Sequence, residues 1–129
     1  MGRYYNGDIE GKFAFGVQSS KAADRFGVKG EPPNELYYYF SEDNLDSLVK
    51  ELNRIEDSFS VEKRNALLAY FDLYTLENIA PMSFDLYLEK GGIERLNTNE
   101  VVEYVDYRLG REILQCIRET GECHFTAEL

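Results

Sequence analysis

Residues 97–129 read NTNEVVEYVDYRLGREILQCIRETGECHFTAEL, and this C-terminal stretch decides the fold. Apolar side chains recur along it every three or four residues, which is the spacing of one buried stripe on an α-helix. They are Val101, Val102, Val105, Leu109, Ile113, Cys116 and Ile117. Asn97 and Glu100 have the spacing of a capping box, and Gly121 is typical of a helix end. The pattern predicts a helix from Thr98 to Thr120, about 34 Å long.

A short strand is predicted after Gly121, because apolar and polar residues alternate there. One face would carry Cys123, Phe125, Ala127 and Leu129, and the other Glu122, His124, Thr126 and Glu128. The helix, the glycine and this strand form one unit around which the rest of the chain should pack.

The preceding chain supplies further strands and helices. Alternation predicts strands at Ile9–Gln18 and Leu36–Phe40, and capping signals predict helices from Ser41 to Asp57, from Val61 to about Tyr74, and from Ser83 to Gly91. Between the two strands, Ser19–Asn34 reads as a surface loop with one helical turn at Lys21–Arg25. We expect a single α+β domain, residues 1–129. A small antiparallel sheet of about three strands, two N-terminal and one C-terminal, would carry about four helices on one face. The last strand should pair with Ile9–Gln18.

Composition narrows the class of protein. The chain has 129 residues, a net charge of −10, 43% hydrophobic residues and 14% aromatic residues. These values exclude a disordered chain, and the lack of a long apolar run predicts no membrane span. Two cysteines and no secretory leader favour the cytoplasm. The acidity disfavours direct nucleic-acid binding, and an exposed sheet edge would make a homodimer or higher oligomer plausible.

No catalytic or metal motif stands out, so we predict neither an enzyme nor a cofactor. His124 is the one histidine, and no nucleophile lies near it in a known motif. Cys116, Cys123 and His124 come close in sequence, but their spacing fits no standard zinc site. We expect them to be core or edge residues, since buried free cysteines usually behave as small hydrophobes.

Acidic and tyrosine side chains are the more informative surface features. The predicted helix from Ser41 carries an acidic outer face at Asp43, Asp46, Glu51 and Glu56. Among ten tyrosines, Tyr37 and Tyr39 oppose the buried face of their strand, and Tyr104 flanks the buried stripe of the long helix. Tyrosine is enriched at binding surfaces, so these seven residues are predicted to contact a partner protein. The alternative is that the acids form an ordinary solvated face and the tyrosines are half-buried.

A second set of residues would suit a small ligand. Cationic and aromatic side chains near the N-terminus, Arg3, Tyr4, Tyr5, Lys12 and Arg25, could surround a nucleotide-like anion, and Arg108 could contribute from the long helix. This set predicts an oligomeric ligand-sequestering protein as an alternative function.

The two ends of the chain resemble a known group. The opening MGRYYNGDIEGKF with Phe15–Ser20, and the closing Glu112–Cys116 with Cys123–Glu128, are similar to small uncharacterised accessory proteins of bacteriophages and mobile elements. The resemblance transfers no site residue. It implies a viral protein that acts against host defence by binding one of its components.

Three hypotheses follow. The leading one is a non-enzymatic phage accessory protein, of the anti-CRISPR or anti-restriction type, that inhibits a host defence factor in the host cytoplasm. Its acidic helices would act as a DNA mimic toward a basic or nucleic-acid-binding host protein. The alternatives are the ligand-sequestering protein and a structural or assembly protein that binds only itself.

Overall fold

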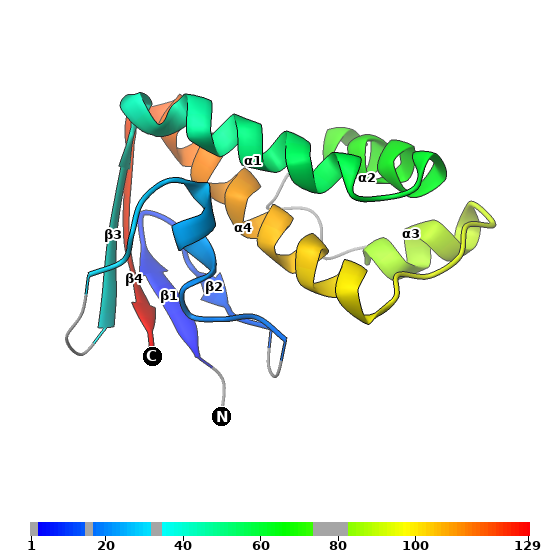
Figure 1. Ribbon diagram of the computed structural model, residues 1–129, viewed down its shortest axis with the longest axis horizontal. Helices are drawn as coiled ribbons and strands as arrows, with labels where there is room; N and C mark the ends of the chain where they lie inside the picture. The colour runs from blue at the N-terminus through cyan, green and yellow to red at the C-terminus, as the bar shows by residue number, and fades with distance from the viewer. Residues whose placement is uncertain (1–2, 15–16, 32–34, 74–82) are drawn as a thin grey trace.

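The computed structural model describes residues 3–14, 17–31, 35–73 and 83–129. It has an α+β fold, with a four-stranded antiparallel sheet on one side and the helices on the other (Figure 1). The strands are β1 (Tyr4–Gly7), β2 (Gly11–Lys12), β3 (Glu35–Ser41) and β4 (Glu122–Glu128). The α-helices are α1 (Leu45–Asp57), α2 (Val61–Leu73), α3 (Phe84–Lys90) and α4 (Thr98–Thr120), with 3-10 helices η1 (Ala22–Phe26) and η2 (Glu42–Asn44). The predicted class is confirmed, although the sheet has four strands where about three were expected.

Helix α4 has the predicted bounds and caps. The side chain of Asn97 accepts a hydrogen bond from the Glu100 amide, and the side chain of Glu100 accepts one from the Asn97 amide, both at 2.9 Å. At the other end Gly121 adopts a left-handed conformation (φ 87°) and donates its N–H to the Ile117 carbonyl at 2.7 Å. These bonds satisfy backbone groups that a helix end otherwise leaves without partners.

Strand β4 lies inside the sheet, whose order is β2-β1-β4-β3. Its pairing with β3 runs from Glu35 opposite Glu128 to Ser41 opposite Glu122. On its other side β4 pairs with β1, not with the predicted strand Ile9–Gln18. That prediction is wrong: the first strand is Tyr4–Gly7, and among the described residues of the predicted segment, 9–14 and 17–18, only Gly11–Lys12 is a strand.

Hydrogen bonds at Asp8 and Gln18 explain this difference. The Asp8 amide donates to the His124 carbonyl at 2.7 Å, and the Asp8 carboxylate accepts from the His124 amide at 2.9 Å, which anchors the end of β1 to β4. Further on, the Gln18 amide donates to the Ala14 carbonyl at 2.9 Å, and the Gln18 side chain accepts from the Ala14 amide at 3.0 Å. Gln18 is therefore bonded back to Ala14, four residues earlier in the chain, a contact that does not occur within one extended strand. Phe15 and Gly16 lie outside the described residues.

The helical layer has two parts. Helix α4 packs on β3 and β4, with α1 beside it, whereas α2 and α3 pack together at the far end of α4 (Figure 1). Aromatic contacts join this far end, such as Tyr70 to Phe84 with ring centroids 5.1 Å apart. Lys63 on α2 also pairs with Glu100 on α4 at 2.8 Å. The expectation that about four helices pack on the sheet is therefore corrected: among the described helices, α4 makes the main contacts with the strands, and α1 packs on α4. No described helix combines the length and apolarity needed to cross a bilayer.

The segment predicted as a surface loop, Ser19–Asn34, instead contributes to the core. The predicted helical turn is present as η1, but Ala22, Ala23 and Phe26 are buried. The Phe26 ring is fully buried against Gly110 in α4, where an added Cβ would lie 2.5 Å from the ring and 2.8 Å from Leu52. Glycine in mid-helix is therefore required here for close packing.

We expect Gly110→Ala to destabilise the protein. Alanine favours a helix over glycine by about 1 kcal/mol, but overpacking a core costs about 1–3 kcal/mol. Because Phe26 is fully buried, the cost of overpacking should exceed the gain in helix propensity. Thermal or denaturant unfolding should then show that the free energy of unfolding falls by about 1 kcal/mol or more. The control is Gly91→Ala, whose added Cβ would meet its nearest neighbour at an ordinary 3.5 Å. A gain of stability in Gly110→Ala would contradict the packing described.

Candidate functional site

The helices leave one face of the sheet uncovered. Alternation sends Tyr5, Tyr38, Phe40, Cys123 and Phe125 toward the helices, where all five are buried. The side chains between them lie on the opposite face, including Tyr4, Asn6, Glu35, Tyr37, Tyr39, Glu122, His124, Thr126 and Glu128. The prediction that Tyr37 and Tyr39 point away from the core is confirmed.

Four of these residues, Tyr37, Tyr39, Glu122 and His124, form a hydrogen-bonded group that we call the outer-face cluster. The Tyr39 hydroxyl donates to one oxygen of Glu122 at 3.1 Å, and the other oxygen lies 3.2 Å from His124 Nε2. His124 Nδ1 lies 3.1 Å from the Tyr37 hydroxyl. A neutral imidazole with its proton on Nε2 satisfies both contacts, donating to Glu122 and accepting from Tyr37.

The outer-face cluster combines exposure with fixed geometry. Tyr37 and Tyr39 are 47% and 43% exposed. The His124 ring contacts Tyr39 edge-on, with centroids 4.6 Å apart. Because strand register sets the positions of the rings and hydrogen bonds hold their hydroxyls, little side-chain freedom would remain to be lost on binding.

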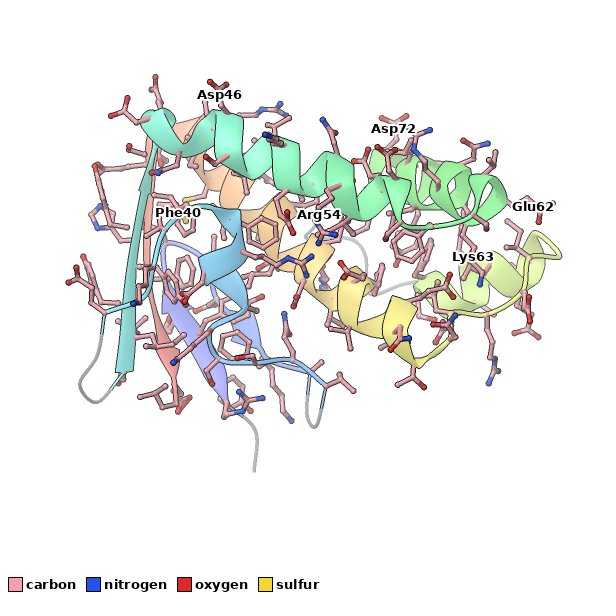
Figure 2. The ribbon with its side chains drawn as sticks, in the orientation of Figure 1. Phe40, Asp46, Arg54, Glu62, Lys63 and Asp72 are labelled. Carbon is pink, nitrogen blue, oxygen red and sulfur yellow. The ribbon has the colours of Figure 1, made fainter. Side chains whose placement is uncertain are left out.

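Acidic residues extend this surface toward α1. The hydrogen bond to Glu122 raises the pKa of the Tyr39 hydroxyl, and the negative charges of Glu122 and Asp43 raise it further. Asp43 therefore lies within electrostatic reach of the cluster. Asp46 is exposed on the outer side of α1 (Figure 2). Exposed acids thus continue from the outer-face cluster onto the start of α1.

The predicted acidic face does not extend to the end of α1. Glu56 is only 9% exposed and accepts a hydrogen bond from the Tyr107 hydroxyl at 2.8 Å. Glu51 is half-buried and pairs with Arg25 and Arg54, the latter lying between α1 and α4 (Figure 2). The predicted exposure of these two acids is wrong because α1 packs against both η1 and α4 and so buries more than one stripe.

Arg25, a predicted ligand contact, is instead a structural cation. Its three guanidinium nitrogens bind Glu51 at 2.7 Å, Glu103 at 2.9 Å and Asp106 at 2.7 Å, which ties η1 to α1 and α4. Burial acts to lower the pKa of Arg25, but its bonds to Asp106 and Glu51 raise it overall. Burial raises the pKa of Asp106, and Arg25 opposes that rise.

Of the other predicted ligand residues, Tyr4, Tyr5 and Lys12 line one hollow of about 410 Å³ beside β1 and β2, whereas Arg3 is engaged elsewhere. Arg3 donates to the Ser20 hydroxyl at 2.5 Å and to the Gln18 carbonyl, so it fixes the segment before η1. Tyr4 lies on the outer face, whereas Tyr5 points inward and donates its hydroxyl to Glu112 at 2.7 Å. Lys12 sits opposite Tyr4 at the edge of the sheet.

Tyr104 also lies away from the outer-face cluster, contrary to its predicted grouping with Tyr37 and Tyr39. It stacks on Phe84 with ring centroids 4.9 Å apart, at the junction of α3 and α4. Together with Tyr5, Lys12 and Arg108 it lines a hollow on the helical side of the sheet.

Cys116, Cys123 and His124 do not form a metal site. Cys123 points into the core and His124 points outward, because neighbouring residues of a strand face opposite ways. Burial raises the pKa of Cys123, so its sulfur is a protonated thiol. Among residues 3–14, 17–31, 35–73 and 83–129, no group of three His, Cys, Asp or Glu side chains could hold a metal ion.

Comparisons with family models, with curated proteins and with solved structures found no match for the chain. The functional argument therefore depends on the geometry of the surface. The sequence patterns did not predict that these four residues form one cluster. The sequence does contain a pattern that indicates it: Tyr37 and Tyr39 are two residues apart on one strand, and Glu122 and His124 are two residues apart on another. The pattern can be recognised only when the register of the two strands is known.

We expect Arg25→Gln to destabilise the protein by about 2–4 kcal/mol at pH 7, because it leaves one buried carboxylate, Asp106, and two half-buried ones without their shared cation. The loss should shrink as the pH falls from 7 toward 4. Asp106 already has a raised pKa in the folded protein, and without Arg25 it should rise further, so protonation increasingly favours the folded state.

Chemical denaturation at several pH values measures this effect. The matched control is Arg54→Gln, since Arg54 is 55% exposed and its loss should cost less than about 1 kcal/mol. A pH-independent loss in Arg25→Gln would contradict the proposed charge balance.

Proposed function

We propose that the protein is a non-enzymatic binding protein that docks its outer sheet face on a basic protein surface. In this proposal it is an accessory protein of a bacteriophage or mobile element, and it inhibits a host defence factor of the anti-CRISPR or anti-restriction type in the host cytoplasm. The observation that carries the proposal is the outer-face cluster, in which two exposed tyrosines are held in place beside Glu122 and Asp43.

Tyrosine supplies the contact area in this proposal. An aromatic ring with a hydroxyl tip can bury a large area and still satisfy its polar atom, which is why tyrosines are common among the residues that dominate binding energy. In the outer-face cluster Tyr37 and Tyr39 project from neighbouring outward positions of one strand. Their fixed positions reduce the entropy cost of association.

In this proposal the exposed acidic side chains determine which kind of partner the protein binds. A net charge of −10 and the exposed carboxylates around the cluster would attract a positively charged surface and repel nucleic acid. Host nucleases that hold DNA or guide RNA present such a surface. In this proposal Asp43 and Asp46 occupy positions that phosphates would otherwise take, while Glu51 and Glu56, which are engaged inside the fold, do not contribute.

The geometry favours binding over catalysis. The Tyr39–Glu122–His124–Tyr37 group lies on an exposed sheet face, whereas transition-state charge is stabilised best in a site that excludes water. Each side chain in the group also hydrogen-bonds another member of it. We therefore assign the group the role of positioning the two tyrosine rings.

We expect the double substitution Tyr37→Ala with Tyr39→Ala to weaken inhibition about 30-fold or more. The assay adds purified protein to a guide-loaded CRISPR nuclease, or to a restriction endonuclease, and measures DNA binding and cleavage. Wild type should inhibit at least one of these enzymes in competition with DNA. The concentration of variant needed for the same inhibition should be higher by about 30-fold or more, since truncating a central aromatic residue typically costs about 2 kcal/mol or more of binding free energy.

The control is Val61→Ala, which removes an exposed apolar side chain from the start of α2. Circular dichroism should show that both variants fold. Inhibition that is unchanged by removal of both tyrosines, or a wild-type protein that inhibits none of the enzymes, would refute the proposal.

Charge reversal tests the acids separately. We expect Asp43→Lys with Asp46→Lys to slow association with the inhibited nuclease about tenfold or more at low salt, with a smaller difference at high salt, because the steering is electrostatic. The control is Glu62→Lys with Glu89→Lys, which reverses the same number of charges on α2 and α3. Both residues are exposed, and Glu62 lies at the end of the molecule away from the sheet (Figure 2). Equal association rates for both charge-reversed proteins would mean that net charge, rather than this surface, governs binding.

A further inference from the structure

Two hollows adjoin along α4 on the helical side of the sheet. The first, of about 330 Å³, lies between α3 and α4, and the second, of about 380 Å³, lies between α4 and the β1–β2 edge. Tyr104, Val105 and Arg108 line both hollows, which therefore adjoin at these side chains, and we call the two hollows together the α4 groove. Each hollow has the size of a small-molecule site.

Arg108 is the exceptional side chain in the α4 groove. It is partly buried, yet among residues 3–14, 17–31, 35–73 and 83–129 it has no hydrogen-bond or ion-pair partner. Arg25 and Arg54, by contrast, each contact carboxylates. The guanidinium nitrogens of Arg108 are not among the buried atoms that lack a partner, so water reaches them, and an anion in the groove would replace that water with charge-assisted hydrogen bonds.

The charge of Arg108 reaches both hollows. Burial raises the pKa of Tyr5, Tyr104 and Glu112, and the positive charge of Arg108 acts against burial at all three. The field of Arg108 therefore acts on groups in both hollows, although burial outweighs it and the pKa of each group stays raised overall. Glu112 does not neutralise it at close range, since its carboxylate accepts the Tyr5 hydroxyl at 2.7 Å and lies beyond ion-pair distance of Arg108. Asp85 lines the other hollow.

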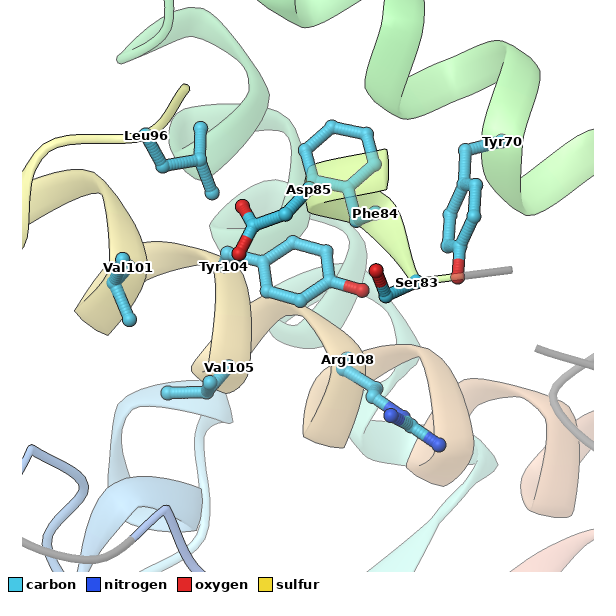
Figure 3. Close-up of a pocket in the computed structure, with 9 residues that line it drawn as sticks. All are labelled: Tyr70, Ser83, Phe84, Asp85, Leu96, Val101, Tyr104, Val105 and Arg108. Atoms are coloured by element: carbon cyan, nitrogen blue, oxygen red, sulfur yellow. The ribbon is translucent and has the colours of Figure 1, made fainter. Parts of the chain in front are cut away.

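The hollow between α3 and α4 is largely apolar and aromatic. Leu96, Val101 and Val105 line it together with the stacked rings of Phe84 and Tyr104, whose planes differ by only 5° (Figure 3). Flat apolar groups bind well against such surfaces, since stacking adds to the burial of area. The hollow beside β1 and β2 is more polar, with Lys12 and Gln18 in its lining.

We propose that the α4 groove binds a small organic anion that carries a flat ring, with the anionic group at Arg108 and the ring in the apolar hollow between α3 and α4. Lys12, at the rim, adds a second positive charge near the anion. This site lies on the opposite face of the sheet from the outer-face cluster, and it does not depend on the proposed function.

Four probes test the proposal on the full chain by calorimetry and by NMR chemical-shift mapping. Two of them, which we call the joined probes, carry both a flat ring and an anionic group: adenosine monophosphate has a phosphate, and indole-3-acetate has a carboxylate. The other two carry only one of these groups, since inorganic phosphate has no ring and indole has no charge. We expect at least one of the joined probes to bind with a Kd below about 1 mM, and at least tenfold more tightly than either part. Which of the two binds identifies the anionic group.

Arg108→Gln should weaken that binding about 10- to 100-fold, as expected for the loss of a charge-assisted hydrogen bond. Arg118→Gln is the control because Arg118 is exposed on the last turn of the same helix. Val105→Phe, which fills the point where the hollows meet, should also block binding. Unchanged affinity in Arg108→Gln, or no binding of either joined probe below 1 mM, would overturn the proposal. The tyrosine variants of the outer face should bind the probe normally.

Discussion

The turn at Gly121 constrains the rest of the structure. Its left-handed conformation ends α4 and begins β4 one residue later, and the Thr120 hydroxyl braces the turn by donating to the Cys116 and Glu122 carbonyls at 2.9 and 2.7 Å. Strand β4 therefore runs back beneath the helix that precedes it. Because β4 then pairs with β3 on one side and β1 on the other, the same turn positions the core and the outer-face cluster. A non-glycine residue at this position would meet both the left-handed strain and the Glu42 side chain 3.3 Å away.

The parts of the fold that are predictable from sequence are those whose signals are local. Helix α4 carries both caps and a long apolar stripe, and β3 alternates cleanly, so both elements have nearly the predicted bounds. Strand β1 has four residues and one buried side chain, Tyr5, so no local pattern distinguishes it. Its existence depends on pairing with β4, more than a hundred residues away, and on the anchor at Asp8. Contacts of that kind cannot be read from periodicity.

The same division holds for the surface. The period of two predicted that Tyr37 and Tyr39 lie outside the core, because a strand cannot bury both faces when helices cover only one. It did not predict the connection through Glu122 and His124, which depends on the register of β3 with β4. On the helix predicted from Ser41 to Asp57 the helical period placed four acids on one face, yet Glu51 and Glu56 bind partners on other elements. An amphipathic pattern identifies the most apolar side of a helix but not which polar residues a second neighbour will cover.

The two proposed binding surfaces depend on different interactions, and salt distinguishes them. At the outer face, exposed carboxylates would act over distances of several ångströms through water, so salt at 0.15 M, with a screening length of about 8 Å, would reduce their effect on association. The tyrosine rings beside them would contribute by burial, which moderate salt changes little. In the α4 groove Arg108 lines two hollows, and salt screens a charge in such a partly enclosed site less than a charge on the open surface. A partner bound mainly by the acids would therefore dissociate as salt rises, whereas one bound mainly by Tyr37 and Tyr39 would be retained, as would an anion held by Arg108.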